Sequence, residues 1–276
     1  MYNKDSCSPI SKKHSDNIYS CLNIKLINKL AKILNIKKNK NIKILYDNIS
    51  KKIKNITNCK QEACWITINN IIRNLSKKEL EEFKDMFKPM MPKSWYKNKN
   101  EWLNTLDIEN VLNQYQKTDN KLYFYGAMPS DYYNKNVCNI YKLCKINIDE
   151  LIRNGIEKIA IVFNTDESDK PGKHWVSIYI DLKGRNSGYP SIYYFDSVGD
   201  KPNKNINMFI SKVRKQKKMN YYYNDMKHQI KNTECGIYSL HFIVYMINNG
   251  NFMKYIKNIK NDDYIQKFRN FFYNKL

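Results

Sequence analysis

The sequence predicts an α+β protein, on three observations. First, three short segments, 158–165, 174–181 and 191–197, are rich in β-branched and aromatic residues and are separated by turn-like residues, which predicts strands. Second, segments with apolar residues at helical spacing lie before and after this group. Third, hydrophobic residues make up 42% of the 276 residues, which is enough for a real core. Strands packed with separate helices are typical of the α+β class.

The first part of the chain is expected to be mainly helical. Apolar residues follow helical spacing in 21–36 and in 66–75. Ser76 is followed three residues later by Glu79, which is the pattern of a capping box and predicts a helix start at that serine. We therefore expect a helical domain over residues 1–90.

A domain boundary is predicted in the segment KPMMPK, residues 88–93, because its two prolines interrupt the helical pattern. The second domain then covers residues 91–276. Its expected elements, in order, are an amphipathic helix within 94–117, the three strands, a helix over 206–218, a strand over 219–226, a helix from Cys235 to Gly250 and a terminal helix over 262–276.

The charge of the chain is strongly positive. There are 48 Lys and Arg against 26 Asp and Glu, a formal net charge of +22. This excess predicts contact with DNA or another polyanion, but the abundant Lys, Asn, Ile and Tyr also fit an A/T-rich coding bias. No apolar run approaches the roughly 18 residues of a membrane span, and the start of the chain has no signal-peptide pattern. We expect a soluble intracellular protein.

Seven cysteines are an odd number in a chain that is not small, which argues against a disulfide framework. We expect all seven thiols to be reduced. The pair in CKQEAC, residues 59–64, has no second pair at zinc-ligand spacing, so no metal site is predicted.

Cys235 stands at the start of a predicted apolar helix, in NTECGIYSLHFIVYM. Free backbone N–H groups at a helix start, together with a nearby imidazolium, lower the pKa of a thiol from ~8.5 to between ~3.5 and ~7.5 and make it a nucleophile. A buried packing cysteine is the ordinary alternative. Gly236 follows and permits a close approach of another segment.

Two further side chains complete a candidate site. His174 begins the strand 174–181, where a sheet can fix it as a general base. Asp196 follows the next strand and can orient that imidazole. Each also fits a structural role, as a half-buried strand histidine and as a turn aspartate.

Two amides upstream of the cysteine are candidate donors to an oxyanion. Gln229 lies six residues before Cys235, and Asn232 lies three before it. Either side chain could join the backbone N–H of Cys235 in stabilising a tetrahedral intermediate. We expect Gln229 to do so and keep Asn232 as the alternative.

The order His174, Asp196, Gln229, Cys235, in the segments GKHWVSIYID, YYFDS and HQIKNTECGIYS, resembles cysteine proteases of the Ulp1/adenain type. This resemblance implies a papain-like core, with a central mixed sheet flanked by helices. It also implies a thiol mechanism that needs no metal or organic cofactor.

More of the chain is similar to a viral branch of this clan that processes polyproteins. The cysteine spacing of CKQEAC and the early KDSC carry this likeness into an N-terminal helical arm domain. The branch implies an endopeptidase that cuts structural polyproteins after Gly-Gly during virion maturation, at assembly sites in the host cytoplasm and in the virion core. The branch has Asn at the position of Asp196, and either residue can orient an imidazole.

The resemblance also assigns two tryptophans. Trp102, in a WLN segment, and Trp175, in HW, correspond to indoles that clamp a Gly-Gly peptide beside the nucleophile. The family has Asp at the position of Thr105, directly after that segment. Core packing is the alternative for each indole.

Two other functions share these residues or this charge. An isopeptidase that removes ubiquitin-like modifiers would use the same site. A non-catalytic basic protein that binds DNA or the virion core would use only the positive surface.

Overall fold

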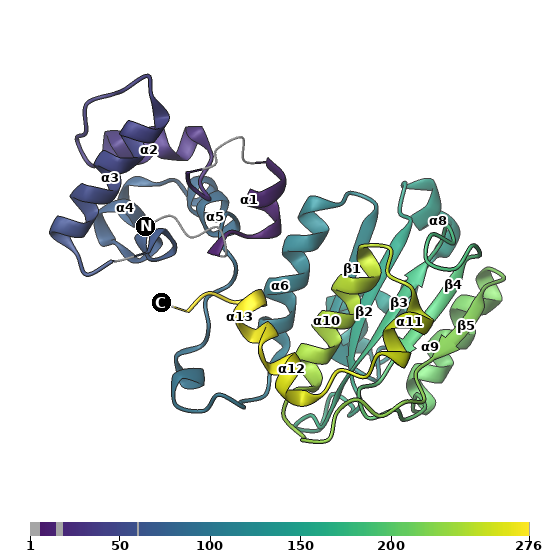
Figure 1. The fold of residues 1–276 in the computed structure, drawn as a ribbon. Coiled ribbons are helices and arrows are strands. Elements are labelled where there is room, and N and C mark those ends of the chain that lie inside the picture. Colours follow the sequence, from purple (N-terminus) through teal and green to yellow (C-terminus); the bar gives the residue numbers. More distant parts are fainter. Residues whose placement is uncertain (1–5, 15–18, 60, 276) are drawn as a thin grey trace. The chain divides into compact units, whose positions relative to one another are not determined.

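The computed structural model describes residues 6–14, 19–59 and 61–275 of the chain (Figure 1). The chain divides into two compact units. One consists of Met1–Lys93 together with Asn270–Leu276, and the other of Ser94–Arg269.

The first unit is a small helical body. Its α-helices are α1 (Pro9–His14), α2 (Ile24–Ile33), α3 (Ile42–Ile56), α4 (Asn69–Asn74) and α5 (Lys77–Asp85), and a 3₁₀ helix covers Glu62–Thr67. Helix α5 starts with the predicted capping box, in which the Ser76 side chain accepts from the Glu79 N–H and the Glu79 side chain accepts from the Ser76 N–H. Apolar side chains of α2, α3 and the 3₁₀ helix share one core.

The end of the chain belongs to this first unit. Asn274 donates its N–H to the Pro89 carbonyl and accepts the Met91 N–H on its own carbonyl, both at 2.8 Å. The prediction ended the helical domain at residue 90 and assigned all later residues to the second domain. In the structure the division falls after Lys93, and seven C-terminal residues, Asn270–Leu276, join the first unit.

The cysteines differ from the prediction. Six of them are paired, as Cys7–Cys21, Cys59–Cys64 and Cys138–Cys144, with Cα–Cα distances of 5.2, 5.8 and 5.5 Å. The expectation that all seven thiols are reduced is therefore wrong for these six. The paired residues are only 14, 5 and 6 positions apart, so local turns bring them together. The odd count reflects one unpaired residue, Cys235.

The second unit is built on a mixed sheet of five strands in the order β1-β2-β3-β4-β5. The outer pairs β1/β2 and β4/β5 are parallel, and the inner pairs β2/β3 and β3/β4 are antiparallel. The strands are β1 (Leu122–Pro129), β2 (Lys158–Asn164), β3 (Trp175–Asp181), β4 (Ser191–Phe195) and β5 (Asn220–Tyr223).

Helices cover both faces of this sheet (Figure 1). Alternate strand residues such as Ile161 and Ile178 pack with α9 on one face. Residues of the other face, such as Phe195, pack on α10, where the Phe195 and Phe242 rings stack at 4.8 Å. The helices of this unit are α6 (Thr105–Thr118), α7 (Lys135–Tyr141), α8 (Ile148–Arg153), α9 (Lys204–Gln216), α10 (Cys235–Ile247), α11 (Phe252–Lys257) and α12 (Asp262–Gln266), and α13 (Phe268–Phe272) leads into the C-terminal segment. The predicted α+β class with a central mixed sheet is confirmed.

None of the helices in the described part of the chain is long and apolar enough to cross a membrane.

Candidate active site

Two sheet strands bring His174 and Asp196 together. His174 directly precedes β3, and Asp196 directly follows β4. The two strands are antiparallel, so the start of one and the end of the other lie at the same edge of the sheet. There the His174 Nε2 atom lies 2.7 Å from Asp196 Oδ1.

The Asp196 carboxylate is held in place by the backbone. Its Oδ1 atom also accepts the Val198 N–H at 2.9 Å. The Asn224 side-chain amide donates to the Asp196 carbonyl at 2.6 Å. The carboxylate is buried, so its orientation toward the histidine ring is fixed before any ligand binds.

Cys235 is the first residue of α10, and this helix packs on the sheet. It is 2% exposed, and it is the cysteine left unpaired in the structure. Its side chain hydrogen-bonds the His174 ring. Because Asp196 occupies Nε2, the ring nitrogen that remains for the sulfur is Nδ1. The structure thus brings His174, Asp196 and Cys235 together.

The charge of the His174 ring follows from these neighbours. Burial by itself lowers the pKa of the imidazole, but hydrogen bonds with Asp196 and Cys235 outweigh it and raise the pKa to about 10. The ring therefore keeps its proton, and a positive charge beside the sulfur, at neutral pH.

Two other histidines have a lowered pKa, in contrast to the raised pKa of His174. Burial and the nearby Lys260 lower the pKa of both His228 and His241 to about 4. His241 pairs through Nδ1 with the Tyr255 hydroxyl at 2.7 Å. His228 accepts the Lys260 N–H at 3.2 Å. Both rings are neutral at pH 7, and these hydrogen bonds involve Tyr255 and Lys260 rather than Cys235.

Gln229 is buried and anchored by one residue of the β4 loop. The Ser197 carbonyl accepts the N–H groups of His228 and Gln229 at 2.9 and 2.7 Å. The Ser197 hydroxyl donates to Gln229 Oε1 at 2.6 Å. This leaves the Nε2 group of Gln229 as the donor end of the amide. Asn232, by contrast, is exposed.

Sequence reasoning missed the residues that support this loop. Ser197 lies within the YYFDS segment, so its position after Asp196 was a usable signal. Asp262 Oδ2 accepts the N–H groups of Ile230 and Lys231 at 3.0 and 2.9 Å. No pattern near Asp262 indicates that contact, because it joins positions about thirty residues apart.

The two predicted clamp tryptophans differ in exposure. Trp102 is 41% exposed, whereas Trp175 is 7% exposed and donates its indole N–H to the Leu103 carbonyl at 2.8 Å. A Cβ added to Gly236 would lie 2.8 Å from Leu103 Cβ. The segment that approaches Gly236 closely is therefore the protein's own Leu103. Only Trp102 of the pair presents a large surface to solvent.

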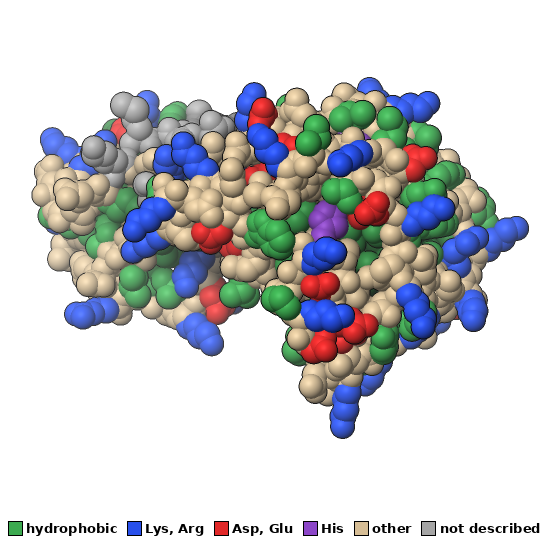
Figure 2. Space-filling view, turned by 90° about the horizontal axis from the view of Figure 1, so that it is seen from below, with side chains coloured by type: hydrophobic (Ala, Val, Ile, Leu, Met, Phe, Trp, Pro, Cys, Tyr) green, Lys and Arg blue, Asp and Glu red, His purple; other side chains and the backbone are tan. Residues whose placement is uncertain are grey.

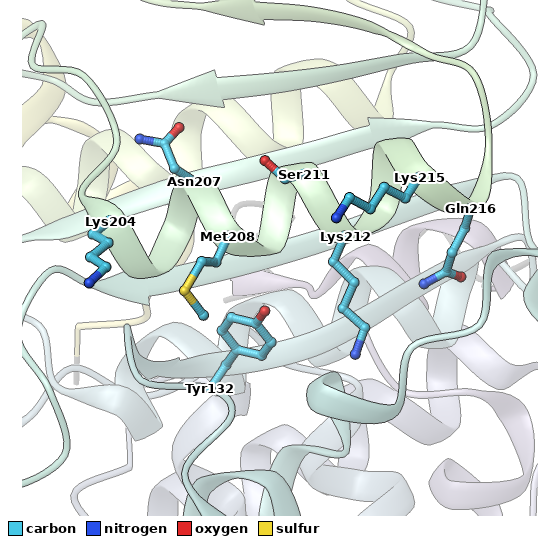
Figure 3. Close-up of a pocket in the computed structure, with 8 residues that line it drawn as sticks. All are labelled: Tyr132, Lys204, Asn207, Met208, Ser211, Lys212, Lys215 and Gln216. Atoms are coloured by element: carbon cyan, nitrogen blue, oxygen red, sulfur yellow. The ribbon is translucent and has the colours of Figure 1, made fainter.

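In the part of the chain that the structure describes, no three His, Cys, Asp or Glu side chains gather closely enough to hold a metal ion. A groove of about 810 Å³ lies along α9, and the residues that line it do not include His174, Asp196 or Cys235. Figure 3 shows lysine side chains of α9 and the ring of Tyr132 along it.

A thiol at a helix start, beside a protonated imidazole backed by a carboxylate, is the arrangement of groups that cysteine proteases use. Residues 154–275 match the model of the Ulp1 protease family, C-terminal catalytic domain. These residues include His174, Asp196, Gln229 and Cys235. This part of the chain is therefore similar to the catalytic domain of that protease family.

Viral proteins are among its relatives. The chain is 36% identical over 179 residues to a protein of Acanthamoeba polyphaga mimivirus that is named as a candidate thiol protease; the match covers 63% of this chain and 57% of the mimivirus protein. It is 28% identical over 229 residues to a cysteine protease of African swine fever virus, covering 76% of this chain and 81% of that protease. The corresponding protein from another isolate of that virus is named SUMO-1 cysteine protease.

The likeness extends to the fold of the whole chain. The crystal structure of the African swine fever virus protease superposes with a TM-score of 0.74 at 22% identity, covering 100% of this chain and 98% of that one. The predicted Ulp1-like fold is confirmed.

Proposed function

We propose that this protein is a viral cysteine endopeptidase that cuts structural polyproteins after Gly-Gly. The observation that carries the proposal is the hydrogen-bonded series from Asp196 through His174 to Cys235. The related cysteine protease of African swine fever virus, matched over 81% of its length, supports a viral role. We propose that the protein acts at assembly sites in the host cytoplasm and in the virion core.

The chemistry begins with the proton of Cys235. In the resting site His174 already holds that proton, so a thiolate faces an imidazolium that Asp196 stabilises. The thiolate attacks the carbonyl carbon of the second glycine, so that a C–S bond forms and the carbonyl electrons move to oxygen. When the tetrahedral intermediate collapses, the C–N bond breaks and His174 protonates the leaving amine. Water, activated by His174, then cleaves the thioester and restores the thiol.

The oxyanion is stabilised by two donors. One is the backbone N–H of Cys235, which lies at the start of α10 where N–H groups lack a partner within the helix. The other is Gln229 Nε2, because Ser197 occupies the oxygen end of that amide. The exposed Asn232 remains the alternative donor, and Gln229 is favoured by its burial and its anchoring.

The preference for glycine follows from crowding near the sulfur. Leu103 already contacts Gly236, the residue after the nucleophile. The exposed Trp102 belongs to the same segment and can cover an extended peptide. Glycines lack a Cβ and fit such a narrow passage, although ordering them costs entropy that strand-like hydrogen bonds must offset. The buried Trp175 contributes by holding the Leu103 carbonyl rather than by contacting substrate.

A second candidate function is removal of a ubiquitin-like modifier. It shares the same site, and the SUMO-1 cysteine protease name of some relatives favours it. The test compares a Gly-Gly-X peptide with a ubiquitin-like fusion that ends in Gly-Gly, using the wild type and Cys235→Ser. Cleavage of the peptide by the wild type alone supports the endopeptidase. Cleavage of the fusion alone would replace it with the isopeptidase.

Contact with DNA is proposed for the basic surface. Residues 201–218 hold seven Lys and Arg and no Asp or Glu. Lys204, Lys212 and Lys215 line the groove along α9. On the face drawn in Figure 2, Lys and Arg side chains are spread widely, with Asp and Glu side chains among them. A non-catalytic DNA-binding protein would need only this surface.

Duplex DNA at increasing salt tests this contact. Binding through phosphates weakens steeply with salt, by a slope of about 0.9 per phosphate on a log–log scale. We expect Lys204→Ala with Lys215→Ala to reduce that slope, whereas Lys37→Ala with Lys38→Ala, lysines of the first unit, leaves it unchanged. A slope near zero in the wild type would assign the charge to coding bias.

A further inference from the structure

A buried ion pair lies directly behind the candidate nucleophile. Glu234 is the N-cap residue of α10 and immediately precedes Cys235. Arg269 Nε donates to Glu234 Oε2 at 3.0 Å, and Arg269 Nη2 lies 3.2 Å from Glu234 Oε1. The Arg269 and Glu234 side chains are 6% and 2% exposed. The pair is therefore bidentate and almost fully removed from water.

The same guanidinium also holds a second segment. Arg269 Nη2 donates to the Glu101 carbonyl at 2.7 Å. Its central carbon lies 4.5 Å from the centre of the Trp95 ring. Glu101 is the residue before Trp102, so one side chain joins the start of the nucleophile helix to the loop that carries the exposed indole.

Only an arginine can make this set of contacts. A guanidinium is planar and presents donors in a fixed fork, so it can bind a carboxylate with two bonds and a carbonyl with a third. A lysine ammonium carries the same charge on a single atom and loses the fork. Removing either partner of a buried pair leaves the other charge unpaired, which is strongly unfavourable.

We propose that Arg269 is a positioning residue that sets the place of the Cys235 sulfur relative to the Trp102 loop. This inference rests on the proposed function only in its claim that the placement of the sulfur serves catalysis. The contacts predict two separable effects of weakening the pair. Movement of Glu234 shifts Cys235 from His174 and lowers kcat, whereas release of the Glu101 carbonyl loosens Trp102 and raises KM. A merely structural ion pair would lower thermal stability and change neither.

The experiment uses the full chain with Arg269→Lys, Glu234→Gln and a matched control, Arg185→Lys. Arg185 pairs with Glu157 at the surface, and its side chain is 46% exposed. The first readout is the rate at which iodoacetamide alkylates Cys235, measured by mass spectrometry at a temperature below unfolding. The second is kcat and KM on a Gly-Gly-X peptide.

We expect Arg269→Lys to slow alkylation of Cys235 at least fivefold, to lower kcat by a similar factor and to raise KM, with Arg185→Lys unchanged. Glu234→Gln keeps the shape of the side chain and decides the matter if Arg269→Lys fails to fold. Unchanged alkylation and kinetics in a folded variant, with only a lower unfolding temperature, would overturn the proposal. If the wild type cleaves no peptide but alkylation still slows in the variants, positioning stands and the proposed substrate falls.

Discussion

The hydroxyl of Ser197 donates a hydrogen bond of 2.6 Å to Oε1 of Gln229, and both side chains are buried. This contact fixes which end of the amide is free to donate. It also connects the proposed oxyanion donor to the residue directly after Asp196. The loop that follows β4 therefore supports both the carboxylate that orients His174 and the amide that would stabilise the oxyanion.

Ser197→Ala should lower kcat about two- to tenfold, because one neutral hydrogen bond contributes ~0.5–1.5 kcal/mol. Gln229→Ala removes the donor itself and should lower kcat by ~10²–10³. Steady-state kinetics on a Gly-Gly-X peptide measure both, with Ser187→Ala, an exposed serine of another loop, as the control. In the double variant the serine change should add almost nothing. A larger loss from Asn232→Ala than from Gln229→Ala would transfer the donor role to Asn232.

The Asp196 carboxylate sets the pH range of the site. Its hydrogen bond helps to raise the pKa of His174 from about 6.5 to about 10. Because the folded-state pKa is the higher one, the stabilisation by the charged ring is complete below about pH 6.5 and is lost as the pH rises through about 10. The alkaline limb of kcat/KM should therefore lie near pH 10 in the wild type.

Asp196→Ala should move that alkaline limb to lower pH, since burial then acts on the ring with less opposition. Asp196→Asn, which keeps an acceptor but no charge, should fall between the two. A pH–rate series for the three proteins measures this order. An alkaline limb at the same pH in all three would mean that the carboxylate does not control the imidazole.

Gly236→Ala should be destabilising although alanine is the better helix former. The new Cβ would lie 2.8 Å from Leu103 Cβ, and overpacking costs ~1–3 kcal/mol against a helix-propensity gain of ~1 kcal/mol. Urea unfolding should give a net loss of about 1 kcal/mol. Adding Leu103→Gly, which removes that Cβ, should make the combined loss smaller than the sum of the single losses. If the two losses of unfolding free energy were simply additive, the residues at positions 103 and 236 would not be coupled by a steric contact.

The two tryptophans should separate in their effects. Trp102→Ala should raise KM about fivefold to tenfold, the equivalent of an aromatic contact of ~1 kcal/mol, with little change in unfolding free energy. Trp175→Ala removes a buried indole and its bond to the Leu103 carbonyl, and should cost ~3–5 kcal/mol of stability. Kinetics and urea unfolding on the same samples give both numbers. Equal stability losses would argue that Trp102 is a packing residue.

Local patterns predicted the strands that position the site. Alternating aromatic and β-branched residues identified β2, β3 and β4 nearly to the residue, and the Ser76–Glu79 capping box identified the start of α5. His174 and Asp196 followed from these strands, because each adjoins a strand end. Strand β1 was missed. Gly126 has φ +122° there, and the register shifts between Phe124 and Ala127, which breaks the alternation.

Contacts between distant positions could not be predicted in this way. Arg269 and Glu101 are 168 positions apart, and Arg269 and Glu234 are 35 apart. Each looks like one more charged residue in a chain with 48 basic and 26 acidic side chains. Their burial as a pair depends on how α10, α13 and the segment before α6 pack, and no periodicity reports that. The pairing of the cysteines was missed for a related reason. The number of cysteines shows that at least one must be unpaired, but it does not show which cysteines lie close together.

In the proposed reaction, His174 activates Cys235. The most direct measurement is mass-spectrometric labelling of the wild type and His174→Ala with a thiol-reactive electrophile that carries a Gly-Gly peptide. We expect one adduct, on Cys235, formed rapidly in the wild type and lost or strongly slowed in His174→Ala. Adducts spread over several cysteines, or equal labelling of Cys235 in both proteins, would contradict it.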